Sequence, residues 1–400
     1  MKALTLSFRY LWARPLAAAL NLLLLSLGLA SITLVLLVSE QIDRAFERDL
    51  AGIDLVVGAK GSPIQLILAG VFHIDVPPGN IALAEVQALQ QDPRVAKLIP
   101  LSLGDSFRGF RVVGTEPEYI HHYGATLATG TLWGAPMQTV LGAGVASATG
   151  LRVGAHFVGS HGLGGGGHAH AENAFEVLGV LAPCQCVLDR LILTATESVW
   201  QVHEKAQAQD EADRKELEAE REITLALIQY RSPLAAVTLP RYVNSATGMQ
   251  AAAPAVEVTR LLRMMSVGSD VLRGFGAVLL LTAGLSVFIA LWNAVRERRF
   301  DLAMLRMLGA SPGKLAALLL CEALWLALLA SALGLLGGHL LTGLVGLLLQ
   351  TEKSLPVSGW LLLGAEVWIP LVAVLVAVLA ALMPALGAYR ADAGELLNTR

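Results

Sequence analysis

Four long apolar runs restrict this chain to one broad class of fold. They cover residues 16–38, 275–295, 315–349 and 367–386, and a helix of about 20 residues is enough to cross a hydrocarbon core. The third run is longer than a straight crossing needs, so we expect it to be tilted, bent or to project beyond the bilayer. Only 15% of the residues are charged, whereas roughly 25% is usual in a soluble domain. The sequence therefore predicts an integral membrane α-helical protein with four transmembrane helices.

The basic residues predict how the chain is oriented in the membrane. They gather before the first run, between the second and third runs, and after the fourth: Lys2, Arg9, Arg14, Arg296, Arg298, Arg299, Arg306, Lys314, Arg390 and Arg400. Cytoplasmic loops carry the excess of Lys and Arg, so both termini and the 296–314 segment are expected in the cytoplasm. A cleaved signal peptide is the alternative for the first run, because Gly28, Leu29 and Ala30 form a passable cleavage site. Apolar sequence continues to Val38, however, which favours a span.

Between the first and second runs, the pattern is that of an extracytoplasmic α+β domain. Short apolar or alternating runs bounded by Gly or Pro predict strands at residues 53–57, 98–101, 110–113, 175–180, 191–194 and 236–239. A helix is predicted at 83–89. The parts before and after about residue 130 are two candidate subdomains. Residues 197–229 are highly charged and lack Gly and Pro. They predict a solvated protruding helix, which is either a soluble insertion or an arm that contacts a partner or the second subunit of a dimer. Helical spacing in 256–270 predicts a helical stalk continuous with the second span.

These expectations give a complete domain organisation. The predicted parts are a cytoplasmic segment with the first span (1–39), the extracytoplasmic domain (40–270) with a His/Gly loop (156–170) and the charged insertion (197–229), the second span (271–295), a cytoplasmic helix and turn (296–314), the third span (315–349), a short extracytoplasmic loop (350–366), the fourth span (367–388) and a cytoplasmic tail (389–400). The formal net charge is −3, which gives no indication of a nucleic-acid partner.

The short cytoplasmic segment 296–314 predicts mechanical coupling to a partner. It reads as an amphipathic helix that ends at Gly309 in the left-handed conformation. Ser311 can cap the next helix, with Pro312 at its first position. Its arginines can contact an acidic partner surface, while Leu302, Met304 and Leu305 offer apolar contacts. The alternative is that the basic residues are ordinary positive-inside anchors.

Three stretches together resemble one family, the MacB/FtsX/LolC-like (type VII) ABC transporter permeases. The first is RERRFDLAMLRMLGASPGKLAALLLCEAL at 296–324, and the second is MPALGAYR followed by AGELL at 383–397. The third is VLGAGVASATGLRVG at 140–154, followed by the predicted strand at 175–180. Each motif is modest, but their order and spacing are specific in combination.

The resemblance implies partners, a location and coupling residues. It implies a multi-pass protein of the bacterial inner membrane that forms a dimer with a second copy or a paralogue, each subunit bound to a cytoplasmic ABC ATPase. ATP and Mg²⁺ would then bind the partner, because the chain contains no G-x-x-x-x-G-K-[ST] motif. No catalytic residues and no cofactor are expected on this chain. The residues expected to couple it to the ATPase are Arg296, Arg298, Arg299, Leu302, Leu305, Arg306 and Gly309.

Three functions are compatible with this sequence. The first is a permease subunit that transmits ATP-driven motion to its periplasmic domain for efflux or extraction of an apolar cargo, such as a lipid, lipoprotein, peptide or drug. The second is an FtsX-like signalling subunit that controls a cell-wall enzyme. The third is a metal-linked ABC assembly. A periplasmic adaptor, a lipoprotein, a cell-wall enzyme and membrane lipids are the corresponding further partners.

The metal hypothesis depends on a group of possible zinc ligands. They are His161, His168, His170, Cys184 and Cys186. We expect the Cys-x-Cys spacing to be too tight for a relaxed disulfide, which leaves free thiols, a metal site or an intermolecular bridge. The alternative for the Gly- and His-rich loop is a flexible linker with incidental cysteines.

The third apolar run contains two ionisable residues and a glycine pair, and the sequence bears differently on each. Glu322 lies near its cytoplasmic end, where a structural hydrogen bond is favoured over proton transfer. His339 lies deeper, and the sequence assigns it no role. Gly334 and Gly338 form a small-xxx-small pair, which allows close helix packing but also reflects how common glycine is in membrane helices.

Overall fold

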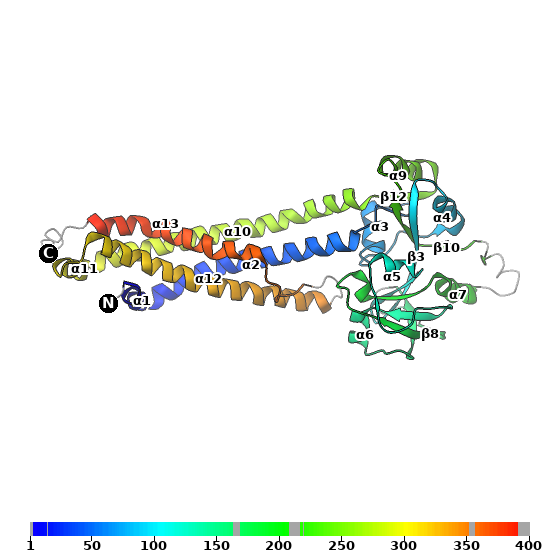
Figure 1. Cartoon of the computed structure of the whole chain (residues 1–400), viewed down its shortest axis with the longest axis horizontal. Helices are drawn as coiled ribbons and strands as arrows, with labels where there is room; N and C mark the ends of the chain where they lie inside the picture. Colours follow the sequence, from blue (N-terminus) through cyan, green and yellow to red (C-terminus); the bar gives the residue numbers. More distant parts are fainter. Residues whose placement is uncertain are drawn as a thin grey trace. The chain divides into compact units, whose positions relative to one another are not determined.

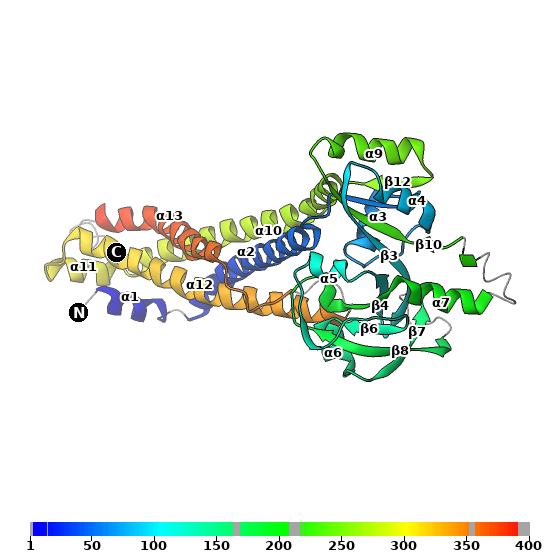
Figure 2. The same ribbon diagram turned by 45° about the vertical axis from the view of Figure 1, so that its right-hand side comes forward.

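The computed structural model describes residues 3–13, 15–162, 169–207, 217–218, 220–351 and 357–390. It divides into two compact units, unit 1 (Met1–Ile42 and Met265–Arg400) and unit 2 (Asp43–Met264). Helices α2 (Pro15–Leu50) and α10 (Pro254–Glu297) have residues in both units. The ribbon shows long helices side by side in unit 1, whereas unit 2 combines strands with short helices (Figures 1 and 2).

Unit 1 contains the four expected membrane spans. Helices α2, α10, α12 (Pro312–Thr351) and α13 (Trp368–Arg390) each carry a stretch long and apolar enough to cross a bilayer. A helix suits these runs because it satisfies every backbone hydrogen bond within the segment, which lipid cannot do. Three shorter elements accompany the spans, namely α1 (Ala3–Leu11), α11 (Arg299–Met307) and the 3₁₀ helix η2 (Gly364–Val367). The predicted four-span fold class, with a large α+β domain between the first two spans, is confirmed.

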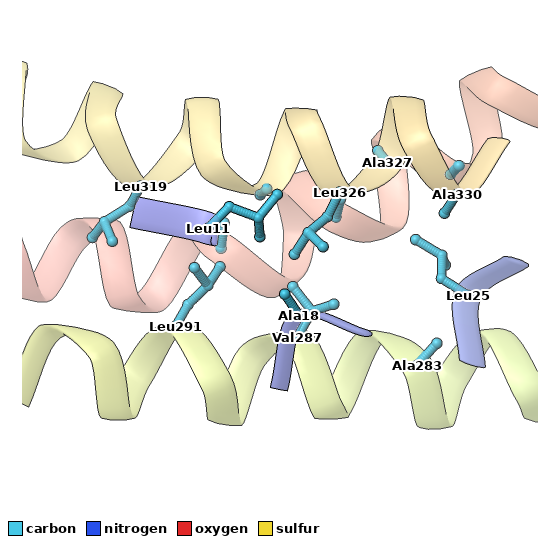
Figure 3. Close-up of a cluster of buried hydrophobic side chains, with 14 of the residues drawn as sticks. Leu11, Ala18, Leu25, Ala283, Val287, Leu291, Leu319, Leu326, Ala327 and Ala330 are labelled. Carbon is cyan, nitrogen blue, oxygen red and sulfur yellow. The ribbon is translucent and has the colours of Figure 1, made fainter. Parts of the chain in front are cut away.

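The bundle core is built from small and branched side chains that interlock. Helix α13 contributes a stripe of buried alanines at four-residue spacing, which lets its neighbours approach closely. In Figure 3, side chains of α10 and α12 point toward one another, with α1 and α2 residues between them. The labelled residues are Leu11, Ala18, Leu25, Ala283, Val287, Leu291, Leu319, Leu326, Ala327 and Ala330.

Glycines on α12 serve two different contacts. A Cβ atom added to Gly334 would lie 2.6 Å from the Cβ of Leu29 on α2, and one added to Gly338 would collide with Thr33. The expected close packing at this glycine pair is therefore confirmed. Further along α12, a Cβ on Gly346 would collide with the backbone of Val357, so this glycine accommodates the segment that follows α12 and not a helix.

His339, which the sequence left without a role, holds this segment in place. Its Nδ1 lies 2.7 Å from the carbonyl oxygen of Gly359, and its Nε2 lies 3.2 Å from Oε2 of the buried Glu366. Two hydrogen bonds between Gln41 and Ser358, of 2.8 and 3.0 Å, attach the same segment to α2. Residues 357–366 are therefore fixed to both α12 and α2.

Unit 2 is organised around one large sheet. Its strand order is β12-β1-β11-β3-β4-β9-β6-β8-β5, and β7 pairs with both β3 and β8. The bounds are β1 (Leu55–Ala59), β3 (Val95–Phe107), β4 (Phe110–Thr115), β5 (Leu127–Gly130), β6 (Gln138–Leu141), β7 (His156–His161), β8 (Ala169–Leu181), β9 (Leu191–Ala195), β11 (Leu225–Tyr230) and β12 (Met249–Ala252). A separate pair joins β2 (Ile81–Ala82) and β10 (Glu222–Ile223).

Two hydrophobic clusters divide unit 2 into halves that share strand β3. The first half of β3 pairs with β11, and its second half pairs with β4 and β7. One cluster is covered by α4 (Leu83–Gln90) and α9 (Ala235–Ala246), and the other by α6 (Ala143–Thr149) and α7 (Thr196–Gln207). Three further elements of the described part are α3 (Pro63–Gly70), α5 (Glu118–His122) and the 3₁₀ helix η1 (Val187–Arg190). The halves are not divided at residue 130, because residues from both ends of the domain form the first cluster.

Two sequence expectations for this domain are wrong. The predicted strand at 236–239 lies in α9, where Ala235, Leu239 and Val243 are buried at four-residue spacing. The predicted helix at 197–229 ends early, because α7 stops at Gln207 and β11 begins at Leu225. Residues 225–228 are all buried and pair with β1 on one side and β3 on the other, which is the environment of a central strand and not of a solvated helix. Residues 208–216 and 219 lie outside the described part. The other five predicted strands and the helix at 83–89 are confirmed, with shifted ends.

Candidate functional site: the segment between the second and third spans

The segment between α10 and α12 is a short helix with a defined end. Helix α11 stops at Met307, and Gly309 has φ +91°, a left-handed conformation that glycine adopts without steric cost. The amide of Gly309 donates to the carbonyl of Arg306 (3.0 Å), and the amide of Ala310 donates to that of Leu305 (3.0 Å). This pair of hydrogen bonds is a Schellman motif. The structure therefore places Gly309 at the helix end, as the sequence predicts, and α12 begins at Pro312.

One face of α11 packs into the bundle. Leu302 is 5% exposed and belongs to the core cluster of the spans, and Leu305 packs against the same cluster. Both residues were predicted to contact a partner, which the burial of Leu302 contradicts. The error arises because amphipathic spacing shows that a helix has an apolar face without showing what covers it.

The other face of α11 is apolar and exposed. Phe300, Met304 and Met307 are 63%, 45% and 59% exposed and follow a spacing of four and three residues, so they form one stripe. Leu308 extends this stripe at the helix end. Arg296 and Lys314 are exposed on either side of α11, and Arg306 is half-buried. The side chain of Arg299, another expected coupling residue, lies outside the described part.

Arg298 points into the bundle and joins three helices. It occupies the break between α10 and α11, and its Nη1 lies 3.5 Å from Oε2 of Glu322 on α12. Its Nη2 donates to the carbonyl of Tyr10 on α1 (3.0 Å), and its guanidinium lies 4.5 Å from the centre of the Tyr10 ring. Arg298 was predicted to contact the ATPase, whereas the structure gives it contacts within the chain. A carboxylate in an apolar run needs a cation nearby, and this signal could have paired Glu322 with an arginine of the adjoining segment.

A small polar cavity lies beside this ion pair. Its volume is about 30 Å³, and its polar lining comes from Tyr10, Asn21, Arg298 and Glu322. A cavity of this size, lined by polar groups, has room for a water molecule. The hydroxyl of Ser286 on α10 lies 2.6 Å from Oδ1 of Asn21 on α2. Polar contacts therefore join α1, α2, α10 and α12 where α11 leaves the bundle, an arrangement suited to fixing the position of α11.

The predicted metal ligands are not assembled in the described residues. Cys184 and Cys186 form a disulfide with their Cα atoms 5.1 Å apart, within the usual range for such bonds. The expectation that their spacing forbids a relaxed bridge is wrong, because Gln185 between them adopts φ +55° and turns the chain back. His168 and the side chains of His161 and His170 lie outside the described part, so zinc binding by these histidines remains a prediction. Within the described residues, no group of three His, Cys, Asp or Glu side chains could hold a metal ion.

Comparisons with known proteins identify two regions of the chain. The family model described as the MacB-like periplasmic core domain matches residues 18–237, and the FtsX-like permease C-terminal model matches residues 273–393. The periplasmic region of MacB from Actinobacillus actinomycetemcomitans is 12% identical, with 53% of this chain and 95% of that chain covered and a TM-score of 0.35. The extracellular domain of the noncanonic ABC-type transporter YknZ from Gram-positive bacteria is 11% identical, with 50% and 98% covered and a TM-score of 0.30. No curated protein matches the chain.

Proposed function

The chain belongs to the MacB- and FtsX-like permease family of ABC transporters, and on that premise we propose that it transmits ATP-driven motion from a separate ATPase to its extracytoplasmic domain. The family implies an ABC ATPase partner and a dimeric assembly. As in other ABC permeases, the chain itself is not the enzyme of the assembly, and we assign ATP hydrolysis to the partner.

The observation that carries this proposal is that α11 has one face buried in the bundle and one exposed apolar face. Leu302 holds the inner face in the bundle, while Phe300, Met304 and Met307 are exposed on the outer face between the basic residues Arg296 and Lys314. An exposed apolar stripe with a positive rim suits a protein partner with an apolar pocket and an acidic edge. Because Arg298 and Leu302 fix α11 to the spans, a displacement of α11 by that partner would be transmitted to the bundle.

We assign the α11 side of the bundle to the cytoplasm. The basic residues Arg296, Arg298, Arg299, Arg306 and Lys314 lie in or beside α11, and the positive-inside rule places such short segments there. Both termini are then cytoplasmic, unit 2 is periplasmic, and the protein resides in the bacterial inner membrane. Helix α10 runs from Pro254 to Glu297 as one element, which supports transmission along the second span.

We assign the transmitted motion to efflux or extraction of an apolar cargo. The model that matches the extracytoplasmic region, over residues 18–237, is that of the MacB-like periplasmic core domain. This supports transport over control of a cell-wall enzyme, which is the alternative function. Lipid, lipoprotein, peptide and drug are the cargo classes to be compared in transport assays.

The test is the stimulation of the ATPase by the permease in reconstituted vesicles. Met304→Glu places a charge in the exposed stripe, and Arg296→Glu reverses the charge at its rim. Both should reduce stimulation at least tenfold, because a buried unpaired charge and a like-charge contact each cost more than about 1.4 kcal/mol. Both substituted side chains are exposed, so the fold should be retained.

A matched control is Val237→Glu, which adds the same charge at a 73% exposed apolar residue of unit 2. It should leave stimulation of the ATPase unchanged. Stimulation at the wild-type level by both α11 variants, with normal membrane insertion, would remove α11 from the coupling role. Deleting residues 302–305 is a poor test, because it also removes a residue of the bundle core.

A further inference from the structure

The Cys184–Cys186 disulfide closes a very short loop between β8 and η1. Only Gln185 separates the two cysteines, and it is exposed with φ +55°. Cys184 is half-buried, whereas Cys186 is only 8% exposed. A disulfide stabilises a fold mainly by restricting the unfolded chain, and this effect grows with loop length. A bridge over one residue therefore gives the domain little stability, which argues against a purely structural role.

The loop is connected to the last turn of α2 through Asp49. The amide of Val187, directly after Cys186, donates to Oδ1 of the buried Asp49 (3.1 Å). Nη2 of Arg190 lies 3.9 Å from the other carboxylate oxygen of Asp49, and its guanidinium also donates to the carbonyl of Phe72. A change in the conformation of residues 184–186 would therefore alter the contacts of Asp49, and through them the position of the last turn of α2.

The surroundings of the two sulfur atoms differ in charge. Asp189 accepts hydrogen bonds from the amides of Cys184 (3.0 Å) and Gln185 (2.7 Å). Its Oδ1 lies 3.5 Å from Sγ of Cys184. The amide of Cys186 donates to the same sulfur atom (3.2 Å). A neighbouring carboxylate disfavours a thiolate, and because Asp189 carries a full charge, negative charge is more costly on Cys184 than on Cys186. Because Cys184 is also the more accessible residue of the two, an external thiolate should attack Cys184, and Cys186 should leave.

We propose that Cys184–Cys186 is a redox-active disulfide that exchanges with an extracytoplasmic dithiol oxidoreductase. A thiolate of the dithiol attacks Sγ of Cys184, the bond to Cys186 breaks, and Cys186 leaves as a thiolate. The second thiol of the reductant loses its proton, attacks its partner sulfur in the mixed disulfide, and releases Cys184. Two electrons pass to the protein, whose thiolates take up the two protons that the dithiol gives up. Asp189 sets which sulfur is attacked, and it keeps the loop in place in the reduced state.

The first test is a redox titration of the full-length protein in detergent. The protein is equilibrated with mixtures of reduced and oxidised dithiothreitol, and its free thiols are alkylated and quantified by mass spectrometry. Half-reduction is expected in the range of the thioredoxin and glutaredoxin couples, with unchanged circular dichroism. Reduction only after denaturation, or two free thiols in every mixture, would overturn the proposal. The Cys184→Ser/Cys186→Ser variant should fold normally, and its failure to fold would show a structural bridge instead.

The second test measures the pKa of the Cys184 thiol in a Cys186→Ser background. The rate of alkylation is followed against pH with and without Asp189→Asn, which keeps an oxygen to accept a hydrogen bond from the loop. Removing the carboxylate charge should lower the thiol pKa and raise the alkylation rate at neutral pH several-fold. Glu85→Gln, in a helix of the same unit, is the matched control and should change neither. An equal thiol pKa with Asp and Asn at position 189 would contradict the assigned order of attack.

Discussion

The guanidinium of Arg298 and the carboxylate of Glu322, 3.5 Å apart, form an ion pair that is nearly inaccessible to solvent. The pair joins the break before α11 to the third span, and Tyr10 covers the guanidinium from α1. A buried pair gives little net stability relative to apolar residues, but losing one partner leaves an uncompensated charge. We therefore expect this contact to determine where α11 lies and not to increase the stability of the bundle.

Arg298→Met should destabilise the bundle by about 3–5 kcal/mol, because the buried Glu322 carboxylate loses the guanidinium that faces it. Arg298→Met/Glu322→Gln should recover most of this loss, since neither residue then carries a charge. Thermal unfolding of the purified protein in detergent measures both effects. A double variant as unstable as Arg298→Met would mean that the hydrogen bond to Tyr10, and not the ion pair, carries the contact.

Gly338→Ala should separate α2 from α12 and destabilise the bundle by about 1–3 kcal/mol, the usual cost of overpacking. The added methyl group would collide with Thr33. Gly337→Ala is the control, because its methyl group would lie 3.4 Å from Ala30, an ordinary contact distance. Denaturation by sodium dodecyl sulfate compares the two variants. Similar stability for both would show that the helices adjust without cost.

His339→Ala should release residues 357–366 from α12, since both ring nitrogens bond to this segment. Amide hydrogen exchange in peptides covering residues 357–366 should increase about tenfold, while exchange in α13 beyond its first turns stays the same. His339→Gln retains one polar group and should give an intermediate increase. Unchanged exchange in the segment would mean that Gln41 and the glycines of α12 hold it without the histidine.

Unit 2 should lose stability as the pH falls below about 6.5 because of His73. Burial, with Arg111 and Arg190 nearby, holds the pKa of His73 well below its ordinary value of 6.5. Between the folded pKa and 6.5, the unfolded chain binds a proton that the folded domain does not, so each pH unit costs up to about 1.4 kcal/mol. The loss begins at pH 6.5 and is complete at the folded pKa.

His73→Asn is the variant for this pH test, because Asn tolerates the left-handed conformation found at this position (φ +53°). Its unfolding temperature should fall less than that of the wild type between pH 7 and pH 5. Some loss should remain, since burial also lowers the pKa of His122. If the unfolding temperatures of the two proteins fell in parallel with pH, His73 would be excluded as the source of the stability loss.

Local sequence patterns correctly predicted the features that depend only on the bilayer or on the conformation of one residue. The spans could be predicted because lipid forces long apolar runs into helices, and the helix end at Gly309 because glycine readily adopts a positive φ. Features that depend on contacts with residues far away in the sequence could not be predicted. Leu302 and Met304 are both apolar residues of α11, and only the packed bundle shows that the first is buried and the second exposed.

The same limit explains the errors in unit 2. Residues 225–228 follow a highly charged stretch, and only pairing with β1 and β3 shows that they form a central strand. The disulfide at Cys184 and Cys186 depends on the backbone conformation of Gln185, which residue spacing does not reveal. The role of His339 depends on Gly359 and Glu366, twenty or more residues away in the sequence.

Strand β3 has a consequence for how this protein can be dissected. Its first half pairs with β11 and its second half with β4 and β7, so the two hydrophobic clusters of unit 2 have this strand in common. A fragment that ends near residue 130 would keep β3 and β4 but lose β11 and β7, and would leave an unpaired edge on the side of β3 opposite β4. Such fragments are candidates for aggregation. Unit 2 should therefore be expressed undivided, and it should unfold in a single cooperative transition.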